Sequence, residues 1–362
     1  MSRKNNKILL LNNRHPYDGV GKYALELFYA LRRNVSNVYA LSWHNQLFKG
    51  SLRSSMIFPY FLVNTLMAFR VPENYSLYHF TNHGLLSLAI LRSELRPSVV
   101  TVHDVIPFTM PRSTIDLFVK KIMVKSLPKA DKIICVSQNT KTELLKVLNI
   151  DPQKIEVVYN GVNHNLFKPR DKITARKKLG LPLEKNIVLN VGSAEKRKNI
   201  PTLFKAMKIL AKDMPSTILI RVGSETRQTK NLIKSLGLSN RIIHFNSITN
   251  RNLAYIYNAA DLFVFPSYYE GFGLPLLEAM SSGLPVISTN VSVMPEIAGG
   301  ASILVNPFDI GTLSFWMREV LSDQDLRERL SIKALKRSEM FSWTKCAVDT
   351  LKVYEDVLER SF

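Results

Sequence analysis

The chain has 362 residues, of which 46% are hydrophobic and 22% are charged. This length suggests about two domains of roughly 150 residues each, and the composition excludes intrinsic disorder for most of the chain. The 49 Lys and Arg residues outnumber the 29 Asp and Glu residues, which gives a net charge of +20. An excess of this kind, spread along the chain, is compatible with a nucleic acid, an anionic membrane or a phosphorylated small molecule as partner, and also with coding bias.

Several other classes of protein are excluded. The two cysteines, Cys135 and Cys346, are too few for a disulfide framework. The longest uncharged stretches, such as residues 54–69, fall short of the ~20 apolar residues that cross a bilayer. The basic N-terminus lacks the apolar core and the cleavage site of a signal peptide. We therefore expect a cytoplasmic protein, or one attached peripherally to the inner face of the membrane.

In the first half of the chain, short apolar runs alternate with amphipathic patterns. Strands that alternate with helices predict βαβ units and a parallel sheet covered on both faces. The expected strands are residues 7–12, 78–80, 98–103, 132–137 and 154–159, and the expected helices are residues 21–33 and 139–148.

The alternation resets after residues 167–182, which are polar and basic, contain two prolines and predict a linker with a short helix at 174–179. The second half then predicts strands at 186–191, 217–222, 241–245, 262–266, 285–289 and 302–305, with helices at 200–212, 252–259 and 311–321. We expect an α/β protein with two doubly wound domains joined near residue 170. Ligands of open α/β sheets bind beyond the carboxyl ends of the strands, so the cleft between the domains is the expected site.

The densest cluster of functional residue types is EGFGLPLLEAM at residues 270–280. Gly271 and Gly273 permit close approach of the backbone to a ligand, and the amides of a helix start bind phosphate readily. Glu270 and Glu278 are placed to accept hydrogen bonds from sugar hydroxyls. The alternative is an ordinary helix start with a capping acid and an exposed Glu278.

Three consecutive cations, Lys196, Arg197 and Lys198, follow the expected strand at 186–191. Arg binds a phosphate through two parallel hydrogen bonds and Lys binds it as a point charge, so this position at a strand end suits a diphosphate. The alternative is a solvated basic loop.

Two glycines, Gly19 and Gly21, stand at the start of the first expected helix. The segment GVGKYA at 19–24 fits the dinucleotide-binding fingerprint only weakly, because a long loop precedes it and no acidic residue follows about 20 positions later at a strand end, and it does not fit the P-loop. A glycine hinge that lets a ligand approach the helix end accounts for the pattern.

His103 and Asp104 follow the expected strand that begins at residue 98, and therefore lie at a carboxyl end that faces the expected cleft. A functional and a structural role for His103 remain open from the sequence alone.

No metal site is expected. His79 and His83 are four residues apart, but the strand pattern at 78–80 gives them no shared helical face. Asp323 and Asp325 resemble a metal-binding DxD motif, but their setting favours acids at the start of a helix.

The chain resembles the retaining glycosyltransferases of family 4, which have the GT-B fold of two Rossmann-like domains with the active site between them. The most specific element is the EX7E motif from Glu270 to Glu278, and the resemblance runs over nearly the whole chain. The other matching segments are NVGSAEKRKNI at 190–200, VTVHDVIPF at 100–108, ICVSQNTKTELL at 134–145 and VVYNGV at 157–162.

This resemblance implies an organisation in three parts. Residues 1–168 form an N-terminal Rossmann-like domain that binds the acceptor, and residues 169–342 form a C-terminal Rossmann-like domain that binds the nucleotide sugar. Residues 343–362 form a helix that crosses back to the first domain.

The resemblance also implies roles for single residues. His103 contacts the donor sugar near the reacting carbon, and Glu270 binds the hydroxyls of that sugar; these two are the expected catalytic residues. Glu278 holds the ribose, while Arg197 and Lys198 clamp the diphosphate. The other expected donor-binding residues act through the backbone: Gly19, Gly21, Gly271, Phe272, Gly273 and Leu274.

One position departs from the family. Many relatives carry Arg directly after the glycine that corresponds to Gly192, where this chain has Ser193. The two-cation clamp of the family therefore depends here on a substitute such as Lys196 or Arg197.

The expected activity is transfer of a hexose from a nucleotide sugar to a hydroxyl of a glycan or lipid-linked acceptor, in the synthesis of a surface polysaccharide or lipopolysaccharide. We expect retention by same-face attack, no metal and no further cofactor, with GDP-mannose favoured over UDP- and dTDP-sugars. The alternatives are a sugar-nucleotide epimerase of the same fold and a basic nucleic-acid-binding protein. The last lacks any recognised nucleic-acid-binding module, so we expect no nucleic acid as partner.

Residues 112–132 combine an apolar helical pattern with flanking cations and can rest on an anionic membrane surface. The apolar positions are Ile115, Phe118, Val119, Ile122, Met123 and Leu127, and the cations are Arg112, Lys120, Lys121, Lys125, Lys129 and Lys132. An ordinary surface helix is the alternative.

Overall fold

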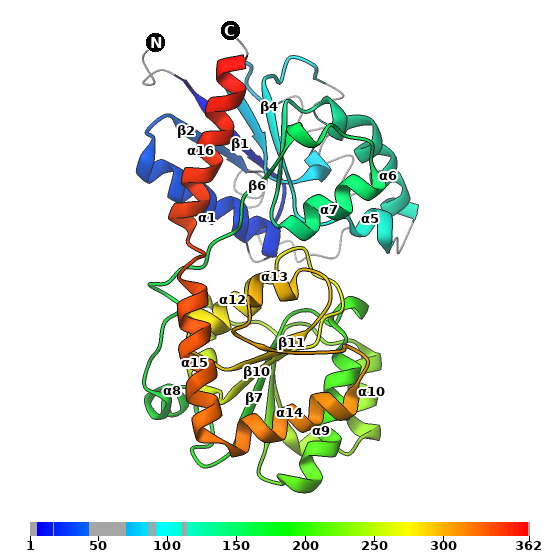
Figure 1. The fold of residues 1–362 in the computed structure, drawn as a ribbon, viewed down its shortest axis with the longest axis vertical. Helices are drawn as coiled ribbons and strands as arrows, with labels where there is room; N and C mark the ends of the chain where they lie inside the picture. The colour runs from blue at the N-terminus through cyan, green and yellow to red at the C-terminus, as the bar shows by residue number, and fades with distance from the viewer. Residues whose placement is uncertain are drawn as a thin grey trace. The chain divides into compact units, whose positions relative to one another are not determined.

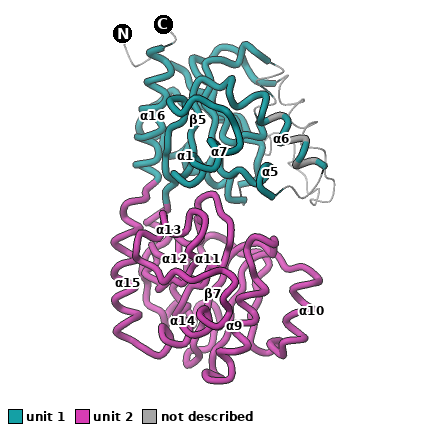
Figure 2. Tube along the Cα trace, turned by 45° about the vertical axis from the view of Figure 1, so that its right-hand side comes forward, with its two compact units in different colours: residues 1–161, 343–362 teal, residues 162–342 magenta. Residues whose placement is uncertain are grey.

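The structure of the chain is a computed structural model that describes residues 6–16, 18–42, 70–85, 88, 92–110 and 114–360 (Figure 1). For residues 115, 116, 118, 119 and 122 it describes the backbone alone. The chain forms two compact units (Figure 2): unit 1, Met1–Gly161 with Trp343–Phe362, and unit 2, Val162–Ser342. The divisions expected from the sequence lie after residues 168 and 342.

Unit 1 is built on six parallel strands in the order β2-β1-β3-β4-β5-β6 (Figure 1). Every residue of β1, β3, β4 and β5 is buried, as a parallel sheet covered on both faces requires. The sequence patterns predicted all but β2, whose mixed burial hides the strand signal. The bounds are β1 Ile8–Asn12, β2 Val38–Ser42, β3 Leu77–Phe80, β4 Ser98–Val102, β5 Lys132–Cys135 and β6 Ile155–Val157.

Helices cover both faces of this sheet. The chain moves in one direction from β1 to β2 and in the other from β3 to β6, so right-handed crossovers place α1 on one face and α6 and α7 on the other. The last helix, α16, packs against α1 and therefore joins the α1 face (Figure 1). The bounds are α1 Gly19–Asn34, α5 Ile106–Thr109, α6 Thr114–Ser126, α7 Gln138–Val147 and α16 Trp343–Arg360.

A buried chain of hydrogen bonds ties α16 to the sheet. The Tyr354 hydroxyl lies 2.6 Å from Nδ1 of His79, and Nε2 of His79 lies 2.8 Å from the Thr101 hydroxyl, which in turn lies 2.9 Å from the hydroxyl of Tyr23 in α1. Burial lowers the pKa of His79 to about 3, so the ring is neutral at pH 7 and has one donor and one acceptor nitrogen. His79 is therefore a structural residue of unit 1.

Unit 2 contains a second parallel sheet, with the strand order β12-β11-β10-β7-β8-β9. All six strands were predicted from the sequence. Their bounds are β7 Ile187–Val191, β8 Ile218–Val222, β9 Ile242–Phe245, β10 Leu262–Phe265, β11 Val286–Thr289 and β12 Ile303–Val305. The expected fold class, α/β with two doubly wound parallel sheets, is confirmed.

The helices of unit 2 also divide between the two faces. Right-handed crossovers put α9 and α10 on one face and α12 on the other, because β7 to β9 and β10 to β12 run in opposite directions. Helix α14 packs on α9, α15 on α12, and α8 on α11. The bounds are α8 Lys172–Leu179, α9 Ile200–Asp213, α10 Arg227–Ser235, α11 Asn250–Ala259, α12 Leu274–Ser281, α13 Met294–Ala298, α14 Ile310–Ser322 and α15 Gln324–Ser338.

The segment 167–182, expected to be a linker, is instead part of unit 2. Arg176 of α8 is buried, and its guanidinium donates to the Ala259 carbonyl at 2.9 Å and to the Asp261 carboxylate at 2.7 Å. Asp261 also accepts from the backbone N–H of Ile187, the first residue of β7. This charge-assisted contact between distant residues is invisible in the local composition, which is why the linker prediction was wrong.

Removing the hydroxyl of Tyr354 tests the buried chain in unit 1. Tyr354→Phe leaves Nδ1 of His79 without its partner, and an unmade buried hydrogen bond costs about 1–3 kcal/mol. Urea unfolding should show a loss of that size, whereas Tyr29→Phe, at a position 55% exposed on α1, should change the unfolding free energy little. Equal stabilities for the two variants would contradict this account.

Candidate active site

The strand order of unit 2 reverses between β7 and β10. Ligands of open α/β sheets bind beyond the carboxyl ends of the strands at such a reversal. The loop that leaves β7 carries residues 195–199, and the loop that leaves β10 carries residues 266–273. The topology thus brings together the two segments that the sequence analysis singled out in this half of the chain.

The carboxylate of Glu270 joins the two loops. Its Oε2 lies 2.6 Å from Nη1 of Arg197, and its Oε1 lies 2.6 Å from Nζ of Lys198. Arg197 also pairs with Glu195 at 2.8 Å. Because Lys198 and Glu270 are both less than a tenth exposed, the alternative of a solvated basic loop is wrong for Lys198.

The charges at this site are set by burial and by one another. Burial by itself raises the pKa of the Glu270 carboxyl, but Lys198 and Arg197 outweigh it and the net pKa lies below its usual value. Burial lowers the pKa of the Lys198 ammonium, and Glu270 acts against that shift. At pH 7 Glu270 is therefore an ionised carboxylate held between two cations.

Two residues that the sequence analysis missed hold the loops in place. Asn199 has a left-handed backbone, with φ of 52°, and its side-chain amide donates to the carbonyls of Pro266 at 3.1 Å and Pro307 at 2.6 Å. Ser292, with φ of 57°, donates to the carbonyl of Glu270 at 2.9 Å and accepts from its N–H at 3.2 Å. Such strained backbones persist only where the surrounding structure fixes them, as here beside the ion-paired loops.

Helix α12 begins beside these loops. Gly273, its N-cap, has φ of 91°, and a Cβ there would lie 2.9 Å from Cε of Met294, so only glycine fits. Its neighbour Phe272 is buried and packs edge-on against Phe341, with 6.1 Å between ring centroids. The remaining predicted backbone-binding residues, Gly271 and Leu274, are partly exposed and flank this turn.

Glu278 lies inside α12 and is 5% exposed. The Tyr257 hydroxyl donates to its Oε2 at 3.0 Å. The alternative of an exposed Glu278 is therefore wrong, and Tyr257 is a partner that the sequence gave no reason to select. The assignment of Glu278 to the ribose stays a prediction.

Unit 1 has its own strand-order reversal, between β1 and β3. The polar residues that follow these strands bond across the sheet edge: the Asn82 amide donates to Oδ1 of Asn13 at 2.9 Å, and the Thr81 hydroxyl donates to the Leu11 carbonyl at 2.8 Å. His83 follows in a short 3-10 helix, and its buried Nδ1 has no hydrogen-bond partner within the described residues. This edge is a second candidate site, with polar atoms suited to an uncharged hydroxyl ligand.

His103 belongs to this edge of unit 1. Its Nε2 lies 2.9 Å from the Thr81 carbonyl, and its ring packs edge-on against Tyr23 at 4.7 Å between centroids. Burial lowers the pKa of His103 to about 4, so the ring is neutral at pH 7 and donates through Nε2. Nδ1 is then an acceptor for a hydroxyl. The carboxylate of the adjacent Asp104 accepts from the N–H of Ile106, the first residue of α5, at 3.0 Å.

The two glycines of α1 differ in role. A Cβ at Gly21 would clash with the backbone carbonyl of His15, and the Gly21 N–H donates to Oδ1 of Asp18 at 2.6 Å. Gly21 is therefore needed for packing within the loop itself. A Cβ at Gly19 would meet nothing within 4 Å, and its donor-binding role stays a prediction.

The expected membrane surface at 112–132 contains fewer residues than the sequence suggests. The assignment of Lys132 to this surface is wrong, because Lys132 is buried in β5 and pairs with Asp356 at 2.8 Å and Glu156 at 3.2 Å. Met123 and Leu127 are also buried. Arg112 lies outside the described residues, as do the side chains of Ile115, Phe118, Val119 and Ile122.

What remains of that surface lies on α6 and just after it. Leu117 and Val124 are about half exposed, Lys121, Lys125 and Lys129 are exposed, and Lys120 is partly exposed. Within the described ranges no helix is long and apolar enough to cross a membrane.

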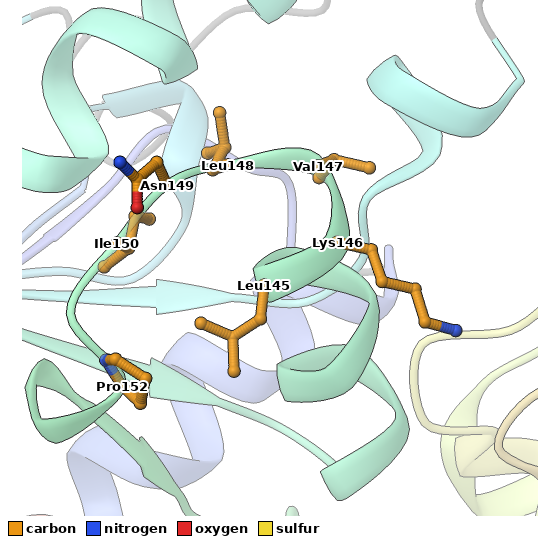
Figure 3. A pocket seen from close by; sticks show the side chains of 7 residues that line it. All are labelled: Leu145, Lys146, Val147, Leu148, Asn149, Ile150 and Pro152. Atoms are coloured by element: carbon orange, nitrogen blue, oxygen red, sulfur yellow. The ribbon is translucent and has the colours of Figure 1, made fainter.

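A surface hollow in unit 1 lies away from the candidate site of that unit. It is lined by residues 145–150 and Pro152, around the end of α7 (Figure 3). Helix α7 runs from the carboxyl end of β5 to the start of β6, so its last residues lie at the opposite edge of the sheet from His103. Lys146 is the one ionisable side chain among the lining residues, and the hollow offers no catalytic group.

Comparisons with known proteins agree with this geometry. Residues 17–166 match the model of "Glycosyltransferase Family 4", and residues 171–337 match that of "Glycosyl transferases group 1". The chain is 30% identical over 274 residues to the O-antigen chain mannosyltransferase B of Escherichia coli, which covers 73% of this chain and 72% of that protein.

Solved structures show the same fold. A sucrose-phosphate synthase from Thermosynechococcus elongatus superposes with a TM-score of 0.81 at 23% identity, over 98% of this chain and all of that one. The Anabaena protein HepE, in complex with UDP and glucose, superposes with a TM-score of 0.79 at 21% identity, over 97% of this chain and all of that one. At these identities the likeness concerns the fold.

The protonation state of His103 is directly testable. Its ring should stay neutral, with the proton on Nε2, from pH 8 to pH 5 and should titrate only near pH 4. Because the ordinary pKa is 6.5, the unfolded chain takes up a proton that the folded chain refuses between these values. His103 therefore lowers the unfolding free energy as the pH falls below 6.5, by up to about 1.4 kcal/mol per pH unit.

Nitrogen-15 NMR of labelled histidine measures this titration, with His103→Gln identifying the signal. A midpoint near pH 6.5, or a proton on Nδ1, would show that the buried neutral tautomer is wrong.

Proposed function

The chain belongs to the glycosyltransferases with the GT-B fold, and on that premise we propose that it is a retaining hexosyltransferase. It transfers a hexose from a nucleotide sugar to a hydroxyl of a glycan or lipid-linked acceptor in the synthesis of a surface polysaccharide or lipopolysaccharide. Membership of this family makes it a transferase; the donor, the acceptor and the stereochemistry are what we propose.

The observation that carries the proposal is the sharing of the Glu270 carboxylate by Arg197 and Lys198 at the β7/β10 reversal. A bound diphosphate competes with Glu270 for the two cations, because its oxygens offer them the same kind of acceptor. Glu270 released in this way is free to accept hydrogen bonds from the hydroxyls of the donor sugar. One cluster thus serves both ends of a sugar diphosphate.

The chemical step depends on the leaving group. When the bond between the anomeric carbon and the diphosphate breaks, negative charge develops on the diphosphate and the sugar gains oxocarbenium character. Arg197, Lys198 and the amides around Gly273 stabilise that charge, and loss of one such preorganised donor typically costs about 2.7–4 kcal/mol of the barrier. The site therefore works by electrostatic stabilisation of the departing group.

Glu270 is a poor nucleophile in this arrangement. Both of its oxygens are ion-paired before the donor binds. Once the diphosphate takes the cations, these oxygens accept hydrogen bonds from the hydroxyls of the donor sugar, so their electron pairs are engaged in both states. We propose that the acceptor hydroxyl attacks from the face that the diphosphate leaves, which retains the anomeric configuration without a covalent sugar–enzyme intermediate.

The acceptor is assigned to the edge of unit 1 at β1, β3 and β4. Neutral His103 and the amides of Asn13 and Asn82 suit hydroxyl groups better than charged ones. For the donor we propose a nucleotide-activated mannose, with GDP-mannose favoured, because a relative at 30% identity is a mannosyltransferase. The HepE complex contains UDP and glucose, so UDP- and dTDP-sugars are the comparison set.

A panel of nucleoside diphosphates and nucleotide sugars tests the proposal. GDP and GDP-mannose should stabilise the protein against thermal unfolding more than the UDP and dTDP compounds. Occupancy at 100 times Kd should add about 2.7 kcal/mol to the unfolding free energy. Stabilisation by none of them would contradict the proposed function, and preference for another base would correct the donor.

Two lysine variants in unit 2 control this experiment. Lys198→Ala removes the cation that contacts Glu270 and should reduce both the stabilisation and the transfer rate. Lys208→Ala, on the exposed side of α9, should leave both unchanged. Equal behaviour of the two variants would show that the residues at the β7/β10 reversal do not bind the donor.

A further inference from the structure

Arg221 in β8 is the largest side chain that is fully buried in the described part of the chain, at 1% exposure. Its Nη1 donates to the carbonyl of Val222, and its Nη2 has no hydrogen-bond partner within the described ranges. No described carboxylate lies within ion-pair distance of it. Burial lowers its pKa to about 10, with Glu225 opposing that shift, so it is charged at pH 7.

The guanidinium of Arg221 lies beside the turn that leaves β7. The N–H of Gly192 donates at 2.9 Å to the same Val222 carbonyl that accepts from Nη1. A Cβ placed on Gly223 would lie 3.2 Å from Nη1 and would clash with the Gly192 carbonyl, so these backbones and the guanidinium are in close contact. The buried charge is thus next to Gly192, which directly follows β7 at the carboxyl edge of the sheet.

Two of the three cations in the loop after β7 are already matched by carboxylates, and the third, Lys196, is exposed to solvent. Arg197 pairs with Glu195 and Glu270, and Lys198 pairs with Glu270. Arg197 and Lys198 with their two carboxylates leave no excess of shielded positive charge for a diphosphate, and Ser193 adds none. An unpaired buried cation at this edge is therefore what the charge balance lacks.

A purely structural role does not explain Arg221. A buried charge with an unsatisfied donor destabilises a fold, and apolar residues of similar volume often serve equally well or better. Oδ1 of Asn190, the strand neighbour of Arg221, also has no partner within the described residues, so the two side chains do not satisfy each other. The free-energy cost of this buried, unpaired guanidinium is explained if its charge acts on a ligand.

We propose that Arg221 is a positioning residue that supplies the diphosphate site with buried positive charge, acting through the turn at Gly192 and Ser193 without touching the ligand. The inference deepens the proposed function and rests on it. The ligand is a nucleoside diphosphate or its sugar ester, and the turn at the carboxyl edge of β7 faces the charged phosphates. Ser193 can then stand where many relatives have Arg, because Arg221 supplies the second positive charge from beneath the turn.

The test compares a charged and an uncharged ligand. Binding of the preferred nucleoside diphosphate and of the matching nucleoside is measured by competition for the parent, Arg221→Met, Arg221→Lys and the control Arg329→Met. Arg329 is exposed on α15. Arg221→Met should weaken diphosphate binding about tenfold, roughly 1.4 kcal/mol, and leave nucleoside binding unchanged. Arg221→Lys keeps the charge and should stay within about threefold of the parent, and the control should match the parent.

Two further measurements separate charge from structure. The unfolding free energy of Arg221→Met should equal or exceed that of the parent, because an unsatisfied buried charge is removed. Adding Ser193→Arg to Arg221→Met should restore diphosphate binding by placing a cation in the turn itself.

Each contrary result overturns the inference. Equal loss of both ligands in Arg221→Met indicates a structural role, as does a misfolded Arg221→Met together with an Arg221→Lys that binds diphosphate poorly. No loss in Arg221→Met while the parent binds refutes the inference and leaves the proposed function intact. A parent that binds no nucleoside diphosphate refutes the proposed function itself.

Discussion

The carboxylate of Glu270, shared between Arg197 and Lys198, is the interaction on which the site in unit 2 depends. It fixes the loop that follows β7 to the loop that follows β10, across the point where the strand order reverses. Two cations and a carboxylate are costly to bury, and they remain charged because each stabilises the other. The arrangement keeps the cations ready for an anion and the carboxylate ready for hydroxyls.

The backbone around Glu270, Arg197 and Lys198 is adapted to their contacts. Asn199 and Ser292 have left-handed conformations, and their side chains bond the carbonyls of the same loops. Unit 1 shows the contrasting case, in which a neutral histidine and two asparagines line the strand ends beside Arg14 and Asp104. The two sheets share a doubly wound topology but carry different side chains at their carboxyl edges. This difference suits the transfer that we propose, from an ionic donor to a hydroxyl acceptor.

Local sequence patterns predicted most of the fold. Buried parallel strands are continuous apolar runs, so every strand except β2 was found, and Asp323 caps a helix as expected by accepting from the N–H of Leu326 at 2.9 Å. Residues 196–198 and 270–278 were selected because each follows a strand. Contacts between distant positions were not predictable: the anchoring of Arg176 by Asp261, the burial of Lys132 and the isolation of Arg221 depend on neighbours far away in the chain.

A crystal structure of the protein with its preferred nucleoside diphosphate tests the central claim most directly. The account predicts phosphate oxygens within hydrogen-bond distance of Nζ of Lys198 and of the amides at residues 192–194, with Glu270 separated from at least one of its two cations. A nucleotide bound with no contact to the loops that follow β7 and β10, for instance in the hollow at residues 145–152, would contradict it.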